Sequence, residues 1–515
     1  MNWKVTEEYL PMPDGVKLYT RIMEPDDGKE QHPIVFVRTP YRDTCTGMDT
    51  DDRRYRIDTF VEHGYTVISQ HCRGKIKSEG VYVPNQERED GLATLEHIRK
   101  MPCYNGEIYL FGLSYLTSVH LCYLEICPKD VKGAAFNIQT DRMYFRNYRN
   151  GCCYNWCNYA WWFNILQEQY PEQKRELAEI RPYKDMAKRV LGVDYPMYTG
   201  CLLNTEYNDF WKSDERTNAI ENLDLPVLFT EGWYDFYTEG MFSMWDRLPE
   251  ETKKKSAFVV GPWQHETEIN GNSQYPLTDG ELPSDYFAEW FNSIREGRDF
   301  KYAQKGKVKY YSLGSGEWHI NEYPSESKNK MKFCFADNGR LTQTPEENDV
   351  KITYKYDPET KPGCFKFLGI HKAEPANSVD GVISFESEAF SEEVSFYGET
   401  SWRMDVSSDC EDTAFFMRLY LVEDGEVYNI TETITSLSHI NPDYIPGEKI
   451  TIDLKTPPCA FTVKKGSGIR VDISSYGGKY VPHANVKGHW AEVTETKIAN
   501  NTIHLDGAYI ELPTE

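Results

Sequence analysis

The sequence has no apolar run long enough to cross a membrane, and its first residues, Met1 to Glu8, contain no apolar signal core. It also has no basic excess, since 57 lysines and arginines stand against 81 aspartates and glutamates, for a formal net charge of −24. Nucleic-acid-binding proteins normally carry a basic stripe. We therefore expect a cytoplasmic protein with neither a membrane nor a nucleic acid as partner.

Cysteines are present, but none of the thirteen belongs to a paired Cys-x-x-Cys spacing suited to zinc. Only Cys152, Cys153 and Cys157 cluster, and a metal held there is the minor alternative to reduced, mostly buried thiols. We expect no metal and no cofactor. Internal repeats and low-complexity linkers are absent too, while 40% hydrophobic and 14% aromatic residues in a 515-residue chain predict a globular protein of two or three domains.

The first 300 residues alternate strand and helix patterns. Residues 1 to 25 alternate apolar and polar around Pro13-Asp14-Gly15, which predicts a β-hairpin, and a helical pattern covers residues 86 to 100. Short continuous apolar runs are typical of strands buried on both faces; they are Ile34–Val37, Tyr65–Ile68, Ile108–Phe111, Ala134–Phe136, Val227–Phe229 and Ala257–Val260. This order predicts a mostly parallel sheet with right-handed crossovers, the α/β class.

Two departures from this rhythm predict further parts. The aromatic interval from about 140 to 220 is far longer than a crossover helix, which indicates an inserted helical cap. From about 305 strand-like segments separated by turn residues predict a β-sandwich of jelly-roll type, beginning with Lys307 to Leu313. The predicted domains are the α/β sheet domain (1–140 and 223–304), the cap (141–222) and the sandwich (305–515).

A nucleophile is predicted at Ser114. The strand-like run ending in Phe111 meets Gly112-x-Ser114, and an apolar helical pattern from Val119 to Ile126 follows, as a nucleophile elbow requires. Gly112 allows a sharp turn, but Leu116 stands where the usual elbow has a second glycine. By itself the motif fits an ordinary strand–turn–helix equally well, so its partners must decide.

A serine nucleophile needs a base and an acid that orients the base, and in this architecture the chain order is Ser, Asp, His. Asp235 comes just after the strand at Val227, and His265 just after the strand at Ala257. Both therefore fall at the sheet edge where open α/β folds bind ligands. Asp209 and Asp246 are the alternatives for the acid on composition alone.

These stretches together resemble the cocaine esterase and X-Pro dipeptidyl-peptidase family, the CocE/NonD-type α/β-hydrolases. The three matching motifs are Gly112-x-Ser114-Tyr115, Gly232-Trp233-Tyr234-Asp235 and Gly261-Pro262-Trp263-x-His265. Further matching stretches are Arg38-Thr39-Pro40-Tyr41, Arg73-Gly74 with Ser78-x-Gly80, and, in the sandwich, Gly398 through Ser407-Ser408-Asp409 to Val422. The resemblance spans nearly the whole chain.

The resemblance implies specific roles. Ser114 is the nucleophile, His265 the general base and then acid, and Asp235 the residue that holds the imidazole. It also implies an oxyanion hole made from the Tyr41 hydroxyl and the backbone N–H of Tyr115, and a phenol can donate to an oxyanion. The chain departs from the family at His71-Cys72-Arg73-Gly74-Lys75-Ile76 and at Thr117, where a glycine is usual, which indicates a divergent branch.

The expected function is a serine hydrolase that acts on a small-molecule carboxylic ester or amide through an acyl-enzyme. Simple esterase, α-amino-acid ester hydrolase and X-Pro dipeptidyl-peptidase activities stay open, the last two needing carboxylates such as Glu168, Glu172, Glu206 or Asp209 to hold a substrate ammonium. Another class is a non-catalytic carbohydrate- or partner-binding protein. The oligomeric state, including a homo-oligomer, is also open. Candidate pocket residues are Trp156, Trp162, Phe163, Trp233 and Trp263.

Overall fold

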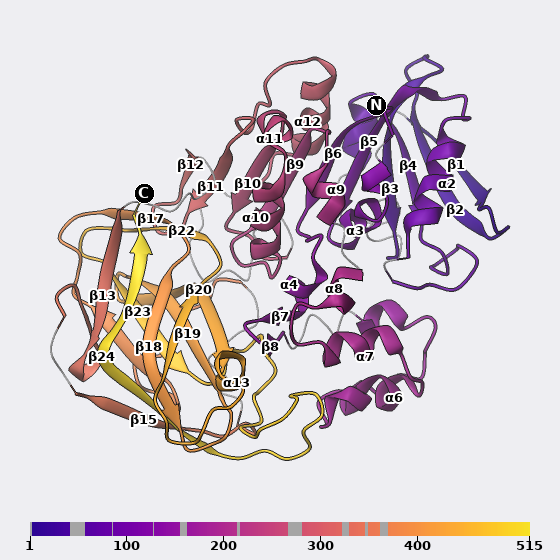
Figure 1. Ribbon diagram of the computed structural model, residues 1–515. Helices are drawn as coiled ribbons and strands as arrows, with labels where there is room; N and C mark the ends of the chain where they lie inside the picture. The colour runs from indigo at the N-terminus through magenta and orange to yellow at the C-terminus, as the bar shows by residue number, and fades with distance from the viewer. Residues whose placement is uncertain are drawn as a thin grey trace.

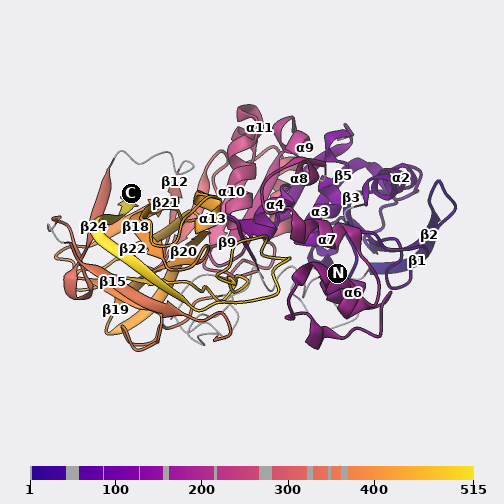
Figure 2. The same ribbon diagram turned by 60° about the horizontal axis from the view of Figure 1, so that its bottom comes forward.

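The computed structural model describes residues 3–41, 57–84, 86–126, 128–154, 162–213, 217–265, 281–321, 329–345, 349–360 and 369–514. Figure 1 shows three parts: an α/β domain that holds the N-terminus, a group of cap helices below it, and a β-rich domain at the left that holds the C-terminus. Figure 2 shows the same division from a second direction. In these ranges no helix has the length and apolarity needed to span a bilayer.

The α/β domain is built on one ten-stranded sheet in the order β1-β2-β4-β3-β5-β6-β9-β10-β11-β12. The strands from β4 to β11 in that order run parallel, as predicted, and β1, β2 and β12 add antiparallel edges. Their bounds are β1 Trp3–Pro11, β2 Lys17–Pro25, β3 His32–Thr39, β4 Thr66–His71, β5 Tyr104–Leu113, β6 Val131–Asn137, β9 Val227–Gly232, β10 Ala257–Gly261, β11 Val308–Ser312 and β12 Glu317–Asn321.

Helices cover both faces of this sheet, which explains the continuous apolar runs. Along β3, Ile34 and Phe36 pack on one face with α2, α3 and α10, while Val35 and Val37 pack on the other face with α1 and α12. The helices are α1 Ile57–Glu62, α2 Arg88–Ile98, α3 Tyr115–Leu121, α10 Thr238–Arg247, α11 Glu250–Lys255 and α12 Tyr286–Arg295.

The cap lies between β6 and β9 and is helical, as predicted, with one short hairpin. Its helices are α4 Met143–Asn147, α6 Met186–Leu191, α7 Pro196–Leu203, α8 Asp209–Ser213 and α9 Thr217–Glu221, and its hairpin is β7 Tyr148–Arg149 with β8 Cys152–Cys153. The hairpin bridges to the β-rich domain, because the N–H of Val481 donates to the carbonyl of Cys153 at 2.9 Å.

The β-rich domain contains a second ten-stranded sheet, in the order β20-β19-β23-β16-β14-β13-β24-β18-β21 with β15 paired to β24, and the two-stranded sheet β17-β22. Its core contains Phe385, Trp402, Phe416 and Phe461. The strands are β13 Lys330–Ala336, β14 Arg340–Thr342, β15 Lys351–Tyr356, β16 Ile383–Ser387, β17 Val394–Gly398, β18 Ser401–Ser408, β19 Ala414–Glu423, β20 Glu426–Ser436, β21 Ile450–Lys455, β22 Cys459–Val463, β23 Gly468–Ser474 and β24 Ala499–Pro513, with helix α13 Leu437–Ile440.

One strand belongs to a different sheet from the one expected. The sequence predicts that Lys307 to Leu313 belongs to the sandwich, but β11 pairs in parallel with β10, with Phe258 opposite Val308, and β12 pairs with β11. The first sheet therefore extends to Asn321. The alternation in this segment indicates a strand but not the sheet to which the strand belongs. The division into domains at residue 305 stays a prediction.

Candidate active site

Ser114 occupies a sharp turn between β5, which ends at Leu113, and α3, which begins at Tyr115. Its backbone has φ 55° and ψ −127°, a conformation that a residue with a side chain rarely adopts and that marks strained functional positions. A Cβ on Gly112 would lie 2.4 Å from the Leu116 carbonyl oxygen, so only glycine fits there. This is the geometry of a nucleophile elbow.

Three side chains from three strand ends form one hydrogen-bonded chain. The Oγ of Ser114 lies 2.9 Å from Nε2 of His265, and Nδ1 of His265 lies 2.7 Å from Oδ2 of Asp235. The Asp235 carboxylate is fully buried, while the His265 side chain is 28% exposed. The other carboxylate oxygen, Oδ1, accepts the N–H of Tyr237 at 2.8 Å. Both carboxylate oxygens are thus fixed.

The loops after β9 and β10 hold each other in register. The N–H of Trp233 donates to the carbonyl of Gly261, and the N–H of Tyr234 donates to the carbonyl of Trp263, each at 3.0 Å. A Cβ on Gly232 would lie 2.2 Å from the Trp263 carbonyl oxygen, so the close approach requires glycine. The two motifs predicted to carry the acid and the base therefore form one bonded unit.

Aromatic rings fix the plane of the His265 imidazole. Phe236 stacks on it with centroids 4.5 Å apart, and Tyr237 lies at 5.6 Å. The other histidine near the serine, His120, is buried within the sheet domain, where its Nε2 contacts the carbonyl of Phe111 at 3.2 Å. Burial lowers the pKa of His120 to about 3, so this ring stays neutral.

The alternative acids do not meet the histidine. Asp209 begins α8 and its side chain is fully exposed, 3.6 Å from Lys212. Asp246 lies on the exposed side of α10. Only Asp235 among these three contacts His265.

The two residues predicted to supply the oxyanion donors follow neighbouring parallel strands. Tyr41 follows β3, which pairs directly with β5, and its N–H donates to Oγ1 of Thr39 at 3.1 Å. Tyr115 is the first residue of α3 and is buried. Tyr41 packs against the same apolar cluster that contains Tyr115.

The structure explains the departure at Thr117. Its hydroxyl accepts the N–H of Asn137 at 3.1 Å and donates to the carbonyl of the same residue at 3.3 Å, at the end of β6. The side chain thus completes the hydrogen bonding of the neighbouring strand end, and the helix keeps its contact with the sheet without glycine.

Sequence reasoning missed Glu231, a buried acid on β9 that lies four residues before Asp235. Its Oε1 accepts the N–H of Gly232 at 2.8 Å, and its Oε2 has no hydrogen-bond partner in the described ranges. Burial, and next the negative charge of Asp235, raise the pKa of Glu231 well above its usual range. Both effects favour the protonated form of the Glu231 side chain. The available signal was a glutamate two residues after the apolar run Val227–Phe229.

Of the predicted pocket residues, Trp162 and Phe163 belong to the cap, and Trp233 and Trp263 to the sheet domain. Trp156, like Cys157, lies outside the described residues. Trp162 lines a cavity of about 340 Å³ between the cap and the sheet domain, together with Gln86 and Met143. Phe163 packs inside the cap, with its ring centroid 5.9 Å from that of Tyr198.

The other two tryptophans are core residues at the base of the site. The indole N–H of Trp233 donates to the carbonyl of Tyr311 at 2.7 Å, and its ring stacks on Phe242. Trp263 is 1% exposed and packs in the apolar cluster that α1 and α12 form with one face of the sheet. A place for any of the five in a substrate pocket stays a prediction. Across the described ranges no three His, Cys, Asp or Glu side chains are grouped to hold a metal.

A strained serine after a parallel strand, bonded to a histidine and through it to a buried aspartate, is the arrangement of the serine hydrolases with the α/β-hydrolase fold. Comparison with known proteins gives the family. The family model described as "X-Pro dipeptidyl-peptidase (S15 family)" matches residues 14–267, and "X-Pro dipeptidyl-peptidase C-terminal non-catalytic domain" matches residues 301–511.

The chain is 25% identical to cocaine esterase of Rhodococcus sp. (strain MB1 Bresler), over 98% of this chain and 96% of that protein. An α-amino acid ester hydrolase shares its fold at a TM-score of 0.83 and 18% identity, over 100% and 97% of the two chains. An aminopeptidase from a marine sediment Thaumarchaeota archaeon shares the fold at a TM-score of 0.81 and 18% identity, over 99% of this chain and 96% of that chain. The chain belongs to the cocaine esterase and X-Pro dipeptidyl-peptidase family and is a serine hydrolase.

Proposed function

We propose that Ser114, His265 and Asp235 are the catalytic triad of a carboxylic ester hydrolase that works through an acyl-enzyme. His265 takes the proton from the Ser114 hydroxyl as that oxygen attacks the ester carbonyl, and then gives it to the leaving alkoxide. Water repeats the sequence on the acyl-enzyme. The continuous bonds of 2.9 and 2.7 Å from Ser114 to Asp235 carry this proposal.

Two donors would stabilise the tetrahedral oxyanion, the Tyr41 hydroxyl and the backbone N–H of Tyr115. The pairing of β3 with β5 supports this assignment, because it brings the residues that follow these strands to the same edge. Tyr115 is the first residue of α3, and the start of a helix favours negative charge. The family resemblance assigns the same two groups.

The surroundings of the candidate carboxylates favour an ester over an aminoacyl substrate. Glu168 pairs with the buried Lys75 at 3.1 Å, and Glu206 pairs with His439 of the β-rich domain at 3.1 Å. Glu172 and Asp209 are exposed. The side chains that pack on His265 are aromatic. In the described ranges these four carboxylates are therefore committed elsewhere or face solvent.

A substrate panel with a matched inactive variant tests this function. We expect hydrolysis of p-nitrophenyl esters to exceed hydrolysis of aminoacyl and X-Pro p-nitroanilides, and Ser114→Ala to lose on the order of 10⁶ in kcat while remaining folded. A fluorophosphonate should label wild type but not Ser114→Ala, whereas a non-catalytic binding protein would not react. A folded Ser114→Ala variant with more than a few per cent of wild-type turnover would disprove the nucleophile.

We also infer that the enzyme is cytoplasmic and acts without a membrane or nucleic-acid partner. The −24 charge supports the second point. Cell fractionation tests the location, and light scattering on the purified protein decides between a monomer and a homo-oligomer.

A further inference from the structure

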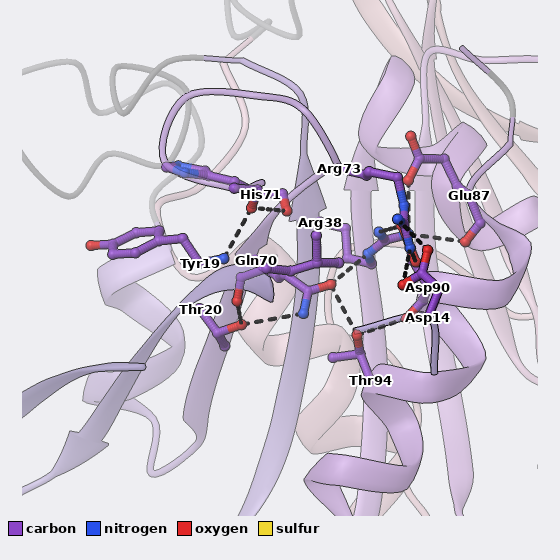
Figure 3. A network of polar contacts seen from close by, with 12 residues as sticks. Asp14, Tyr19, Thr20, Arg38, Gln70, His71, Arg73, Glu87, Asp90 and Thr94 are labelled. Carbon is purple, nitrogen blue, oxygen red and sulfur yellow. Dashed lines mark hydrogen bonds and ion pairs between the residues drawn. The ribbon is translucent and has the colours of Figure 1, made fainter. Parts of the chain in front are cut away.

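A buried ion pair lies beside the nucleophile elbow and takes no part in the triad. Arg38, on β3, is fully buried, and its guanidinium lies 3.0 Å from Oε2 of Glu87, directly before α2. The same guanidinium donates to the carbonyl of Glu87 at 3.1 Å and to Oε1 of Gln70 at 2.9 Å. Figure 3 shows Arg38 at the centre of this network.

The network is anchored on several elements, so its centre is rigid. Asp90 of α2 lies 3.9 Å from the Arg38 guanidinium and accepts two hydrogen bonds from Arg73, at 3.0 and 2.7 Å. Arg73 also pairs with Asp14 in the turn between β1 and β2, at 2.7 Å (Figure 3). Burying two charges is costly, and here part of that cost is not offset, because Nη2 of Arg38 and Oε2 of Glu87 have no hydrogen-bond partner among the described residues.

Both proposed oxyanion donors are connected to this one ion pair. The Tyr115 hydroxyl donates to Oε1 of Glu87 at 3.4 Å, a long bond but one made inside a fully buried site. On the other side Arg38 directly precedes Thr39, the last residue of β3, whose Oγ1 accepts the N–H of Tyr41. The hydroxyl of Tyr115 and the strand that leads to Tyr41 therefore converge on Arg38 and Glu87.

We propose that the Arg38–Glu87 pair is a positioning element that sets the two oxyanion donors relative to each other. Glu87 holds the first residue of α3 through the Tyr115 side chain, and Arg38 holds the strand end before Tyr41. Neither residue contacts substrate. This inference rests on the proposed oxyanion hole. Its physical basis is that a small misplacement of a hydrogen-bond donor raises the free energy of the transition state.

Tyr115→Phe is the decisive variant, because it removes only the hydroxyl that contacts Glu87 and keeps the backbone N–H. We expect kcat to fall about 5- to 50-fold, less than the 10²–10³ seen when a donor is deleted, with KM nearly unchanged. The inhibition constant of an arylboronic acid, whose tetrahedral adduct places an oxygen in the oxyanion hole, should rise by a similar factor.

Tyr65→Phe is the matched control. Tyr65 is also buried and its hydroxyl donates to a side chain, Asn292, at 2.9 Å, but it lies at the amino end of β4, whereas Ser114 follows the carboxyl end of β5. It should lose a comparable amount of thermal stability and keep wild-type kcat. Equal kinetics for the two variants, or a rise in KM alone for Tyr115→Phe, would overturn the proposal.

Glu87→Gln tests the ion pair itself. We expect a lower melting temperature and a loss of kcat at least as large as that of Tyr115→Phe; a folded Glu87→Gln enzyme with wild-type kcat and boronate affinity would overturn the proposal. If this variant does not fold, Tyr115→Phe still decides. Fluorophosphonate labelling separates this failure from a failure of the proposed function, since an enzyme whose Ser114 never reacts has no triad to assist.

Discussion

Replacing Asp235 by asparagine tests the triad with the smallest change in shape. The amide oxygen can keep the hydrogen bond from the N–H of Tyr237, so the loop should stay folded. The amide nitrogen then faces Nδ1 of His265, where Oδ2 stands now. Because that nitrogen is a donor, it favours the tautomer with the proton on Nε2, which faces Ser114 and cannot then accept the serine proton.

The expected loss of kcat is large because the imidazole of His265 is held in one orientation. Its ring is fixed by stacking on Phe236, and the bond to Asp235 is short and fully buried at the carboxylate. The same change in another triad lowers kcat by about 10⁴. At about 1.36 kcal/mol for each factor of ten, this equals about 5.4 kcal/mol of transition-state stabilisation.

Initial rates on a p-nitrophenyl ester measure the effect, with circular dichroism to show that the variant is folded. Asp246→Asn and Asp209→Asn are matched controls, since they make the same chemical change at the two exposed acids that composition alone could not exclude. Both should keep wild-type kcat. An Asp235→Asn enzyme within tenfold of wild type, or a collapse of activity in either control, would refute the assignment of the acid.

Two further predictions concern groups beside the triad. Tyr41→Phe should lower kcat by roughly 10²–10³ with little change in KM or stability, and steady-state kinetics that stay within threefold of wild type would rule out its hydroxyl as an oxyanion donor. Burial raises the pKa of Glu231 above its usual 4.5 in the folded protein, so above about pH 4.5 this residue lowers the stability of the folded protein as the pH rises. Glu231→Gln removes this dependence, so its melting temperature should rise relative to that of wild type as the pH is raised above about 5; a constant difference between the two melting temperatures would contradict the raised pKa.

Much of the fold could be predicted from the sequence because the signals were local. Short apolar runs bounded by turn residues gave the parallel strands, and the length of the interval after β6 indicated the cap. The sheet that accepts Lys307 to Leu313 could not be predicted in this way. Strand pairing there depends on the contact between Phe258 and Val308, residues about 50 positions apart that no local pattern connects.

The site was predictable to the extent that topology determines it. His265 and Asp235 followed from the rule that ligands bind at the carboxyl ends of parallel strands. Tyr41 came only from the family resemblance, because a tyrosine after a strand is common. Glu231 and the Glu87 contact with Tyr115 escaped prediction, since their importance depends on burial and on partners that the sequence does not place together.

Each residue of the Gly232-Trp233-Tyr234-Asp235 motif has a separate physical task. Gly232 allows the close approach of the loop after β10, and the Trp233 indole N–H bonds to the end of β11. The Tyr234 hydroxyl donates at 2.8 Å to the carbonyl of Asn429, on β20 of the β-rich domain. Asp235 therefore receives its position from both domains: one supplies the strand ends and the other braces the loop that carries the carboxylate. The β-rich domain, which holds none of the triad residues, is in this way part of the structure that keeps Asp235 against His265.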